Sequence, residues 1–218
     1  DLLKSNPSTH TFSLKSQFRV KGGNAYVDFV RSLLQGRLTS DASKFRSKDY
    51  EFTLFESLEP MVEQIRQRNQ EYGLSRLIAG YSWEWKSQKS NVPDIELDGL
   101  ALKWNSTNED WINSPNAFQE VGCIHTTQGY DLNYTGIIFG TEITYNPSTK
   151  AIEIISANYK DKKGKQGIAD PEQLRAYILN IYHTMMLRGI HGTYVYVCNE
   201  PLREYMRGVI GGVKLNKI

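Results

Sequence analysis

Apolar residues recur along this chain at two spacings, which separate the expected helices from the expected strands. From Tyr26 to Leu34 they recur every three or four positions, as on one face of an amphipathic helix. Gly22 precedes this helix and Gly36 ends it, because glycine readily adopts the backbone angles of turns. The same spacing predicts three further helices, at residues 59–72, 170–188 and 200–206.

Short stretches rich in aromatic and β-branched residues predict strands. They lie at residues 50–55, 77–81, 121–124, 135–139, 142–145, 151–155 and 193–198, with a strand or extended entry at 12–20. Asn146-Pro147-Ser148-Thr149 separates two of these strands and is typical of a hairpin turn. Strands that alternate with helices favour an α/β fold with a mostly parallel central sheet flanked by helices.

Residues 82–116 interrupt this alternation. The segment is polar and rich in turn residues, and it carries tryptophan together with Pro93 and Pro115. We therefore expect a single domain over residues 1–218 with a Trp-rich insertion at about 82–116. The chain begins at Asp1 rather than Met, and no secretory signal pattern follows. We interpret this start as a cut inside a longer polypeptide.

Composition narrows the class of protein. With 39% hydrophobic and 23% charged residues among 218, the chain can bury a sizeable core, which excludes disordered, collagen-like and coiled-coil classes. The longest apolar run, Tyr194 to Cys198, is far shorter than the roughly 18 residues of a membrane span. Two cysteines cannot build a disulfide framework, so we expect a reducing, cytoplasmic compartment. The net charge of +2 excludes a strongly basic nucleic-acid coat, but not a local basic surface.

Three polar motifs stand at the ends of expected strands and helices. They are Gln17-Phe18-Arg19, His125-Thr126-Thr127-Gln128-Gly129-Tyr130-Asp131 and Thr184-Met185-Met186-Leu187-Arg188. Taken singly, each has an ordinary structural interpretation: Arg19 as a solvated or salt-bridged residue, the second motif as a polar turn, and Arg188 as a cation at a helix C-terminus. Their order along the chain is more informative than any one of them.

In this order the motifs resemble the second RecA-like lobe of a superfamily 1 helicase. The resemblance is closest to the Schlafen-type group 3 DNA/RNA helicase-like family, many of whose members are bacterial helicase-like proteins. There, an aromatic-Arg pair opens the lobe, His-(Ser/Thr)-x-(Lys/Gln)-Gly-x-(Glu/Asp) accompanies a central strand, and a helix ending in Thr-x-x-x-Arg precedes another strand. The resemblance extends from about residue 12 to residue 206.

The resemblance implies a nucleotide-binding hydrolase. Arg19 and Arg188 would be arginine fingers that reach ATP held with Mg²⁺ mainly on a separate N-terminal lobe, since guanidinium groups stabilise charge on a transferred phosphoryl group. Phe18 would stack on the base, and Asp131 would bind the ribose or orient Arg188. The nucleotide-binding residues that it implies are Gln17, Phe18, Gln128, Gly129 and Asp131.

The same resemblance implies contact with single-stranded DNA or RNA. His125, Thr126 and Thr127 would offer imidazole and hydroxyl groups to its backbone. The sequence contains no Gly-x-x-x-x-Gly-Lys-(Ser/Thr) phosphate loop. We therefore expect part of a nucleic-acid-dependent ATPase that is inactive as an isolated lobe and needs the N-terminal ATP-binding lobe as its partner.

Two alternatives remain open at this stage. Asp94, Glu96 and Asp98, with Glu84-Trp85-Lys86, resemble the carboxylates and lysine of a metal-dependent nuclease, although their order is reversed. A non-catalytic interaction module is the other alternative. The cysteines and histidines show no zinc-ligand spacing.

Two further features have simple interpretations in the sequence. Lys160, Lys162, Lys163 and Lys165 form a charge run, and such runs are most often solvated. The tryptophans of the insertion are expected to be buried, because aromatic rings contribute a large apolar area to a core.

Overall fold

The computed structural model describes residues 19–39 and 44–214. Its four α-helices are α1 (Gly23–Leu34), α2 (Leu58–Tyr72), α3 (Pro171–Met186) and α4 (Glu200–Val209). Side chains cap two of them: Asp170 accepts from the backbone N–H of Glu172 at the start of α3, and Asn199 accepts from that of Leu202 at the start of α4. All four predicted helices are confirmed.

Six strands form a central sheet, and every neighbouring pair in it is parallel. The strands are β1 (Glu51–Phe55), β2 (Arg76–Ala79), β5 (Val121–Gly122), β6 (Leu132–Phe139), β9 (Gly189–Val197) and β10 (Gly212–Lys214). Their order across the sheet is β10-β1-β9-β6-β2-β5. The prediction of a mostly parallel sheet flanked by helices is confirmed.

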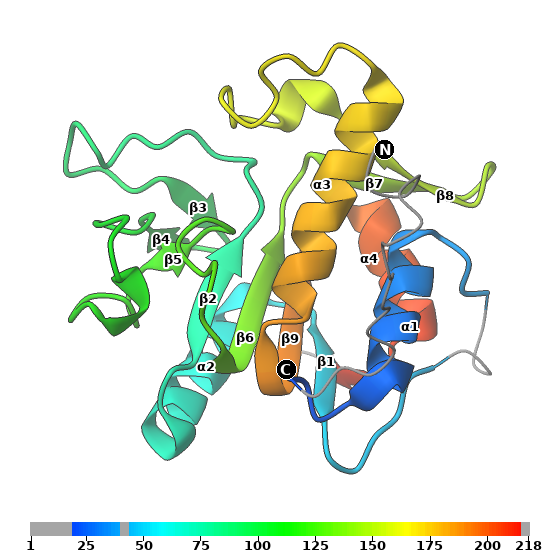
Figure 1. The fold of residues 1–218 in the computed structure, drawn as a ribbon, viewed down its shortest axis with the longest axis horizontal. Helices are drawn as coiled ribbons and strands as arrows, with labels where there is room; N and C mark the ends of the chain where they lie inside the picture. Colours follow the sequence, from blue (N-terminus) through cyan, green and yellow to red (C-terminus); the bar gives the residue numbers. More distant parts are fainter. Residues whose placement is uncertain (1–18, 40–43, 215–218) are drawn as a thin grey trace, which may run out of the picture.

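Side chains of the central strands alternate between two hydrophobic cores. In β9, Val195 and Val197 face a core built with α1, α3 and α4, whereas Tyr194 and Tyr196 face a core built with α2 and the insertion. Strand residues alternate between the faces of a sheet, so a continuous apolar run supplies both cores. Figure 1 shows α3 and α1 in front of the sheet.

Two small antiparallel pairs lie outside the central sheet. One is the predicted hairpin, β7 (Ile143–Asn146) with β8 (Ala151–Ile154), which is confirmed. The other, β3 (Ile95–Leu97) with β4 (Leu100–Leu102), lies inside the insertion. Two 3-10 turns complete the described elements, η2 (Trp111–Asn113) and η3 (Ser156–Asn158). Beyond β4, Trp104 pairs with Val121 in an isolated parallel bridge.

Strand β9 begins at Gly189, earlier than the expected start at 193. Glycines here indicate a turn in the sequence, but the structure uses them for close packing. A Cβ on Gly192 would collide with the ring of Tyr134 and the carbonyl of Glu51 on the neighbouring strands. The lack of a side chain therefore lets three strands approach one another at this point.

Within the described ranges, no helix is both long and apolar enough to cross a lipid bilayer. The extended entry expected at residues 12–20 falls almost wholly outside the described residues.

Candidate nucleotide-facing site

The register of the parallel sheet brings two predicted site residues to one edge. Asp131 immediately precedes β6, and Arg188 immediately precedes β9. The two strands are paired, with Leu132 opposite Gly189. Since the amino ends of parallel neighbours meet at one edge of a sheet, the residues just before them lie close together.

Arg19 reaches the same edge from the segment before α1. The backbone N–H of Lys21 donates to the carbonyl of Ile190 at 2.9 Å, which holds this segment along the start of β9. Nε of Arg19 then lies 2.6 Å from Oδ1 of Asp131, in an ion pair whose side chains are about half exposed. The ion-pair partner of Asp131 is thus Arg19. The roles that the resemblance implies for Asp131, binding the ribose or orienting Arg188, stay predictions.

Arg188 is buried beside this pair, with 7% of its surface exposed. Its Nη1 donates to the carbonyl of Tyr130 at 3.2 Å, and its Nε has no hydrogen-bond partner among the described residues. Burial lowers the pKa of Arg188, the positive charge of Arg19 lowers it further, and Asp131 opposes the shift. Arg19 is therefore paired with Asp131, Arg188 feels the charges of both, and a buried N–H of Arg188 lacks an acceptor.

This arrangement has the chemistry of an anion site. Buried polar groups are nearly always hydrogen-bonded, so an unpartnered guanidinium N–H marks a position that an acceptor would fill. A phosphate oxygen is a strong acceptor for such a group. The prediction that Arg19 and Arg188 converge on one edge of the sheet agrees with this geometry.

The loop at residues 123–131 joins the two edges of the sheet, because it leaves the carboxyl end of β5 and reaches the amino end of β6. His125, Gln128 and Gly129 are exposed on it. Gly129 has a φ of 88°, a left-handed conformation that favours glycine. The ring of His125 lies 6.1 Å from that of Tyr81, which follows β2 at the carboxyl edge.

The two threonines of this loop point inward, in contrast to the role implied for them. The backbone N–H of Cys123 donates to Oγ1 of Thr126 at 2.9 Å, and Oγ1 of Thr127 donates to the carbonyl of Cys123 at 3.1 Å. Both threonines are buried. Their hydroxyls close the turn, so in this conformation neither is presented to a nucleic acid.

Gln17 and Phe18 lie outside the described residues, and their implied nucleotide contacts stay predictions. Tyr130 is a site residue that the motif did not single out. Its carbonyl accepts from Arg188, and its hydroxyl donates to Asp110 of the insertion at 2.8 Å. No sequence signal identifies a residue that acts through its main-chain oxygen.

The carboxylates of the nuclease alternative do not converge on a metal. Asp94 is buried and accepts from the backbone N–H groups of Lys86, Ser87 and Trp104, at 2.6, 2.8 and 2.8 Å. Across the residues that the structure describes, no three His, Cys, Asp or Glu side chains are grouped to hold a metal ion. Asp94 therefore has a structural role in the insertion.

Comparison with known proteins places these residues in context. The family described as Schlafen group 3, DNA/RNA helicase domain, matches residues 3–199. The chain is 25% identical over 212 residues to the uncharacterized protein YPL245W of Saccharomyces cerevisiae, a match that covers 88% of this chain and 47% of that protein. It thus spans about half the length of that curated relative.

Among solved structures, the C-terminal domain of a possible DNA helicase from Lactobacillus plantarum WCFS1 aligns with a TM-score of 0.37 and 14% identity. The alignment covers 86% of this chain and 92% of that one.

Proposed function

The chain belongs to the Schlafen group 3 DNA/RNA helicase domain family, and from this premise we propose that it is the C-terminal motor lobe of an ATP-dependent DNA/RNA helicase or translocase. In this proposal the ATP and its Mg²⁺ are bound mainly by an N-terminal lobe. The present lobe supplies positive charge to the phosphates from across the cleft between the two lobes.

The observation that carries the proposal is that Arg19 and Arg188 converge beside Asp131 at one edge of the sheet. The unpartnered Nε of Arg188 adds to it. During phosphoryl transfer, negative charge spreads over the oxygens of the transferred group, and fixed guanidinium groups stabilise it. Arg188 is held by the carbonyl of Tyr130 and Arg19 by Asp131. Both donors are thereby positioned before the nucleotide arrives.

The loop at residues 123–131 supports the nucleic-acid part of the proposal. One end carries the exposed His125 and the other ends at Asp131, the partner of Arg19. Single strands are held through phosphates and stacked bases. We propose that His125 and the loop backbone contact the strand, and that Thr126 and Thr127 maintain the shape of the loop.

The test uses a polypeptide that carries this chain together with its N-terminal ATP-binding lobe. Arg188→Lys and Arg19→Ala are expected to lower kcat for strand-stimulated ATP hydrolysis by about 10³-fold or more, the range for an arginine finger, with little change in KM. Arg66→Ala is the matched control, since Arg66 lies on α2 and pairs only loosely with Glu63, at 3.8 Å.

The variant Asp131→Asn distinguishes a role in positioning Arg19 from a role in stabilising the fold. Because the Arg19–Asp131 pair is about half exposed, its loss is expected to change unfolding free energy by only about 0.2–1 kcal/mol, while kcat falls through misplacement of Arg19. Full kcat in both arginine variants would contradict the proposal. So would robust ATP hydrolysis by residues 1–218 alone, because the sequence contains no phosphate loop.

A further inference from the structure

A cavity of about 230 Å³ opens at the carboxyl edge of the sheet, opposite the edge that holds the two arginines. Tyr81, which follows β2, and Cys123, which follows β5, line it together with Trp83, Trp85 and Trp104. Ligand pockets for drug-sized molecules are typically about 300–1,000 Å³. This smaller cavity suits a single ring system.

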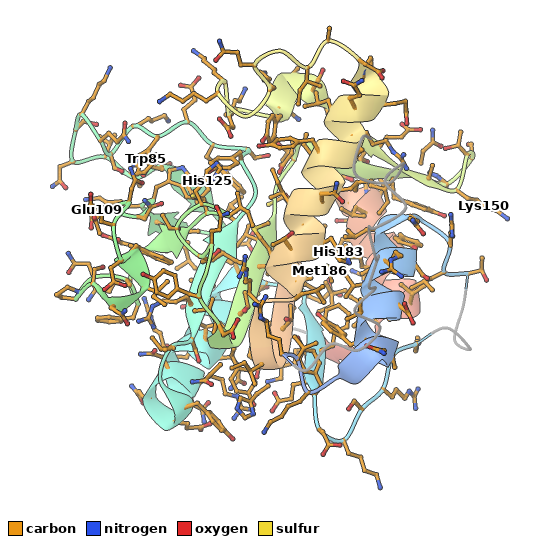
Figure 2. The ribbon with its side chains drawn as sticks, in the orientation of Figure 1. Trp85, Glu109, His125, Lys150, His183 and Met186 are labelled. Carbon is orange, nitrogen blue, oxygen red and sulfur yellow. The ribbon has the colours of Figure 1, made fainter. Side chains whose placement is uncertain are left out.

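Aromatic rings form a continuous path from the cavity to His125 in the loop at residues 123–131. The ring of Trp104 lies 6.4 Å from that of Trp83 and 6.0 Å from that of Tyr81, which in turn lies 6.1 Å from His125. Trp83 and Trp85 are only half-buried, so part of each ring is accessible. Figure 2 shows Trp85 and His125 on the same side of the molecule.

Asn105 contributes an unsatisfied acceptor to the wall of the cavity. It is fully buried, and its Nδ2 donates to the carbonyl of Thr107 at 3.0 Å and to Asn108 at 3.1 Å. Because the carbonyl of Thr107 can only accept a hydrogen bond, the amide atom of Asn105 that faces it must be the nitrogen, Nδ2. Oδ1 has no partner in the described part of the chain. A ligand N–H would supply the missing donor.

A loop of lysines closes the other side. The backbone N–H of Lys160 donates to the carbonyl of Tyr81 at 2.7 Å, which holds the loop against the end of β2. Lys160, Lys162 and Lys163 all line the cavity and are exposed. Two acidic residues, Glu84 and Asp161, also line it. Three lysines against two acids leave a positive balance of charge around the cavity, which favours an anionic ligand.

We propose that this cavity receives one unstacked base of a single-stranded nucleic acid. The half-buried tryptophans stack on the base, Asn105 accepts a base N–H, and the lysines bind the adjoining phosphates. The inference rests on the proposed function and adds to it a second point of contact with the strand, next to His125.

The observations favour a base over a cationic ligand. Aromatic cages with acidic residues bind quaternary ammonium groups, and Glu84 and Asp161 supply such acids here. One oxygen of Asp161, however, already accepts from the backbone N–H of Gly164 at 2.8 Å. The three lysines around the opening would repel a cation and attract a phosphate.

A second cavity of about 380 Å³ gives the strand room to continue. It shares Trp85, Trp104 and Asn105 with the first and is otherwise lined mainly by polar side chains, among them Lys103 and Ser106. The shared residues show that the two cavities are adjacent. A base in the first cavity thus leaves polar space beside it for the neighbouring sugar and phosphate.

The test is a fluorescence titration of the 218-residue chain with a short oligothymidylate. Three of the four tryptophans line the cavity, so binding is expected to quench the intrinsic emission. Trp85→Ala is expected to weaken binding about tenfold or more, the effect of one lost stacking contact, and Trp85→Phe to retain most of it. Replacing Lys162 and Lys163 together by Ala is expected to reduce the dependence of affinity on salt.

Matched controls are Phe118→Ala, which removes an exposed ring outside the cavity, and Lys48→Ala, which removes an exposed lysine elsewhere. Both are expected to bind like the native chain. The lysine variants keep the test valid if Trp85→Ala fails to fold, because their side chains are exposed.

The outcomes separate this inference from the proposed function. If the native chain binds the oligonucleotide and all cavity variants bind it equally well, the cavity assignment alone is wrong. If the native chain binds no single strand, the proposed nucleic-acid role is wrong as well. The test of Arg19 and Arg188 by ATP hydrolysis does not depend on this result. Quenching by tetramethylammonium but not by oligothymidylate would identify a cation cage and overturn the inference.

Discussion

Glu142 holds a carboxyl group in a fully buried position just beyond the end of β6. The hydroxyl of Tyr182 donates to its Oε1 at 2.5 Å, and the hydroxyl of Ser82 donates to its Oε2. Burial raises the pKa of Glu142, and the hydrogen bonds from Ser82 and Tyr182 oppose the shift. A Cβ on Gly80 or Gly140 would collide with this trio, so glycine is required at both positions.

The raised pKa of Glu142 predicts a pH-dependent stability. The folded chain retains a proton that the unfolded chain releases, so the contribution of this group is fully present below the ordinary pKa of about 4.5 and is lost as pH rises toward the folded pKa. Glu142→Gln cannot ionise. Urea unfolding at a series of pH values above 4.5 is therefore expected to show a smaller loss of stability with pH than in the native chain.

The control for this experiment is Glu109→Gln, at an exposed glutamate of the insertion. It is expected to keep the native dependence of unfolding free energy on pH. An unchanged dependence in Glu142→Gln would show that Glu142 is ionised in the folded chain throughout this range.

At single residues, the sequence predicted identity better than direction. The motif order singles out Arg19 and Arg188. The register of β6 and β9 brings Asp131 beside Arg188, and the bond from Lys21 to Ile190 brings Arg19 to the same edge. The inward direction of Thr126 and Thr127 does not follow, because a hydroxyl serves a turn or a ligand equally well. The hydrogen bonds of both hydroxyls to the backbone of Cys123 show that they close the turn.

The insertion is organised by one carboxylate. Asp94 accepts three backbone N–H bonds, two from the turn at Lys86 and Ser87 and one from Trp104 beyond β4. These bonds join the segment that carries Trp85 to the segment that carries Trp104, and both tryptophans line the cavity at the carboxyl edge. The insertion is therefore a defined platform for those rings.

Removing the carboxylate of Asp94 is expected to make the segments that carry Trp85 and Trp104 more mobile. Hydrogen bonds to a charged group contribute about 1.5–3 kcal/mol each, and Asp94→Ala leaves three donors without their acceptor. The amides of Lys86, Ser87 and Trp104 are expected to exchange with deuterium at least tenfold faster, and oligothymidylate affinity to fall.

Glu96→Ala is the control, because Glu96 is an exposed carboxylate on β3. It is expected to leave exchange and affinity unchanged. Native exchange at all three amides of Asp94→Ala would show that other contacts organise the insertion.

At the scale of elements, the helices and longer strands could be predicted, and of the shortest strands only β5 was. The four helices and the β7–β8 hairpin follow from periodicity and turn residues. Strands β3, β4 and β10 each span three residues, too few for alternation to distinguish them from loop. The tryptophans and lysines also had ordinary interpretations separately. The fold brings them to one cavity, where the backbone bond from Lys160 to Tyr81 holds the lysine loop.

Across the whole molecule, one loop joins the two edges of the sheet at which the proposed sites lie. The arginines lie at the amino edge and the aromatic rings at the carboxyl edge, and residues 123–131 run between them from His125 to Asp131. Because the segment is short, we expect a shift at one end to displace the other. We expect this loop to couple nucleotide binding to strand binding.

Coupling of this kind is reciprocal in binding. In the polypeptide with both lobes, a non-hydrolysable ATP analogue is expected to change oligothymidylate affinity about 5- to 150-fold, and the oligonucleotide to change analogue affinity by the same factor. His125→Ala is expected to reduce that factor, as measured by paired titrations. His183→Ala on α3 serves as the control. Native coupling in His125→Ala would show that the route lies elsewhere.

The bridge between Trp104 and Val121 has one more consequence. Val121 belongs to β5, the outermost strand on this side, and it donates to the carbonyl of Lys103 at 2.9 Å while its own carbonyl accepts from Asn105 at 3.0 Å. The rim of a sheet normally leaves such groups open to a strand from another molecule. The insertion occupies them from within the same chain, and this protects the protein from edge-to-edge aggregation on that side.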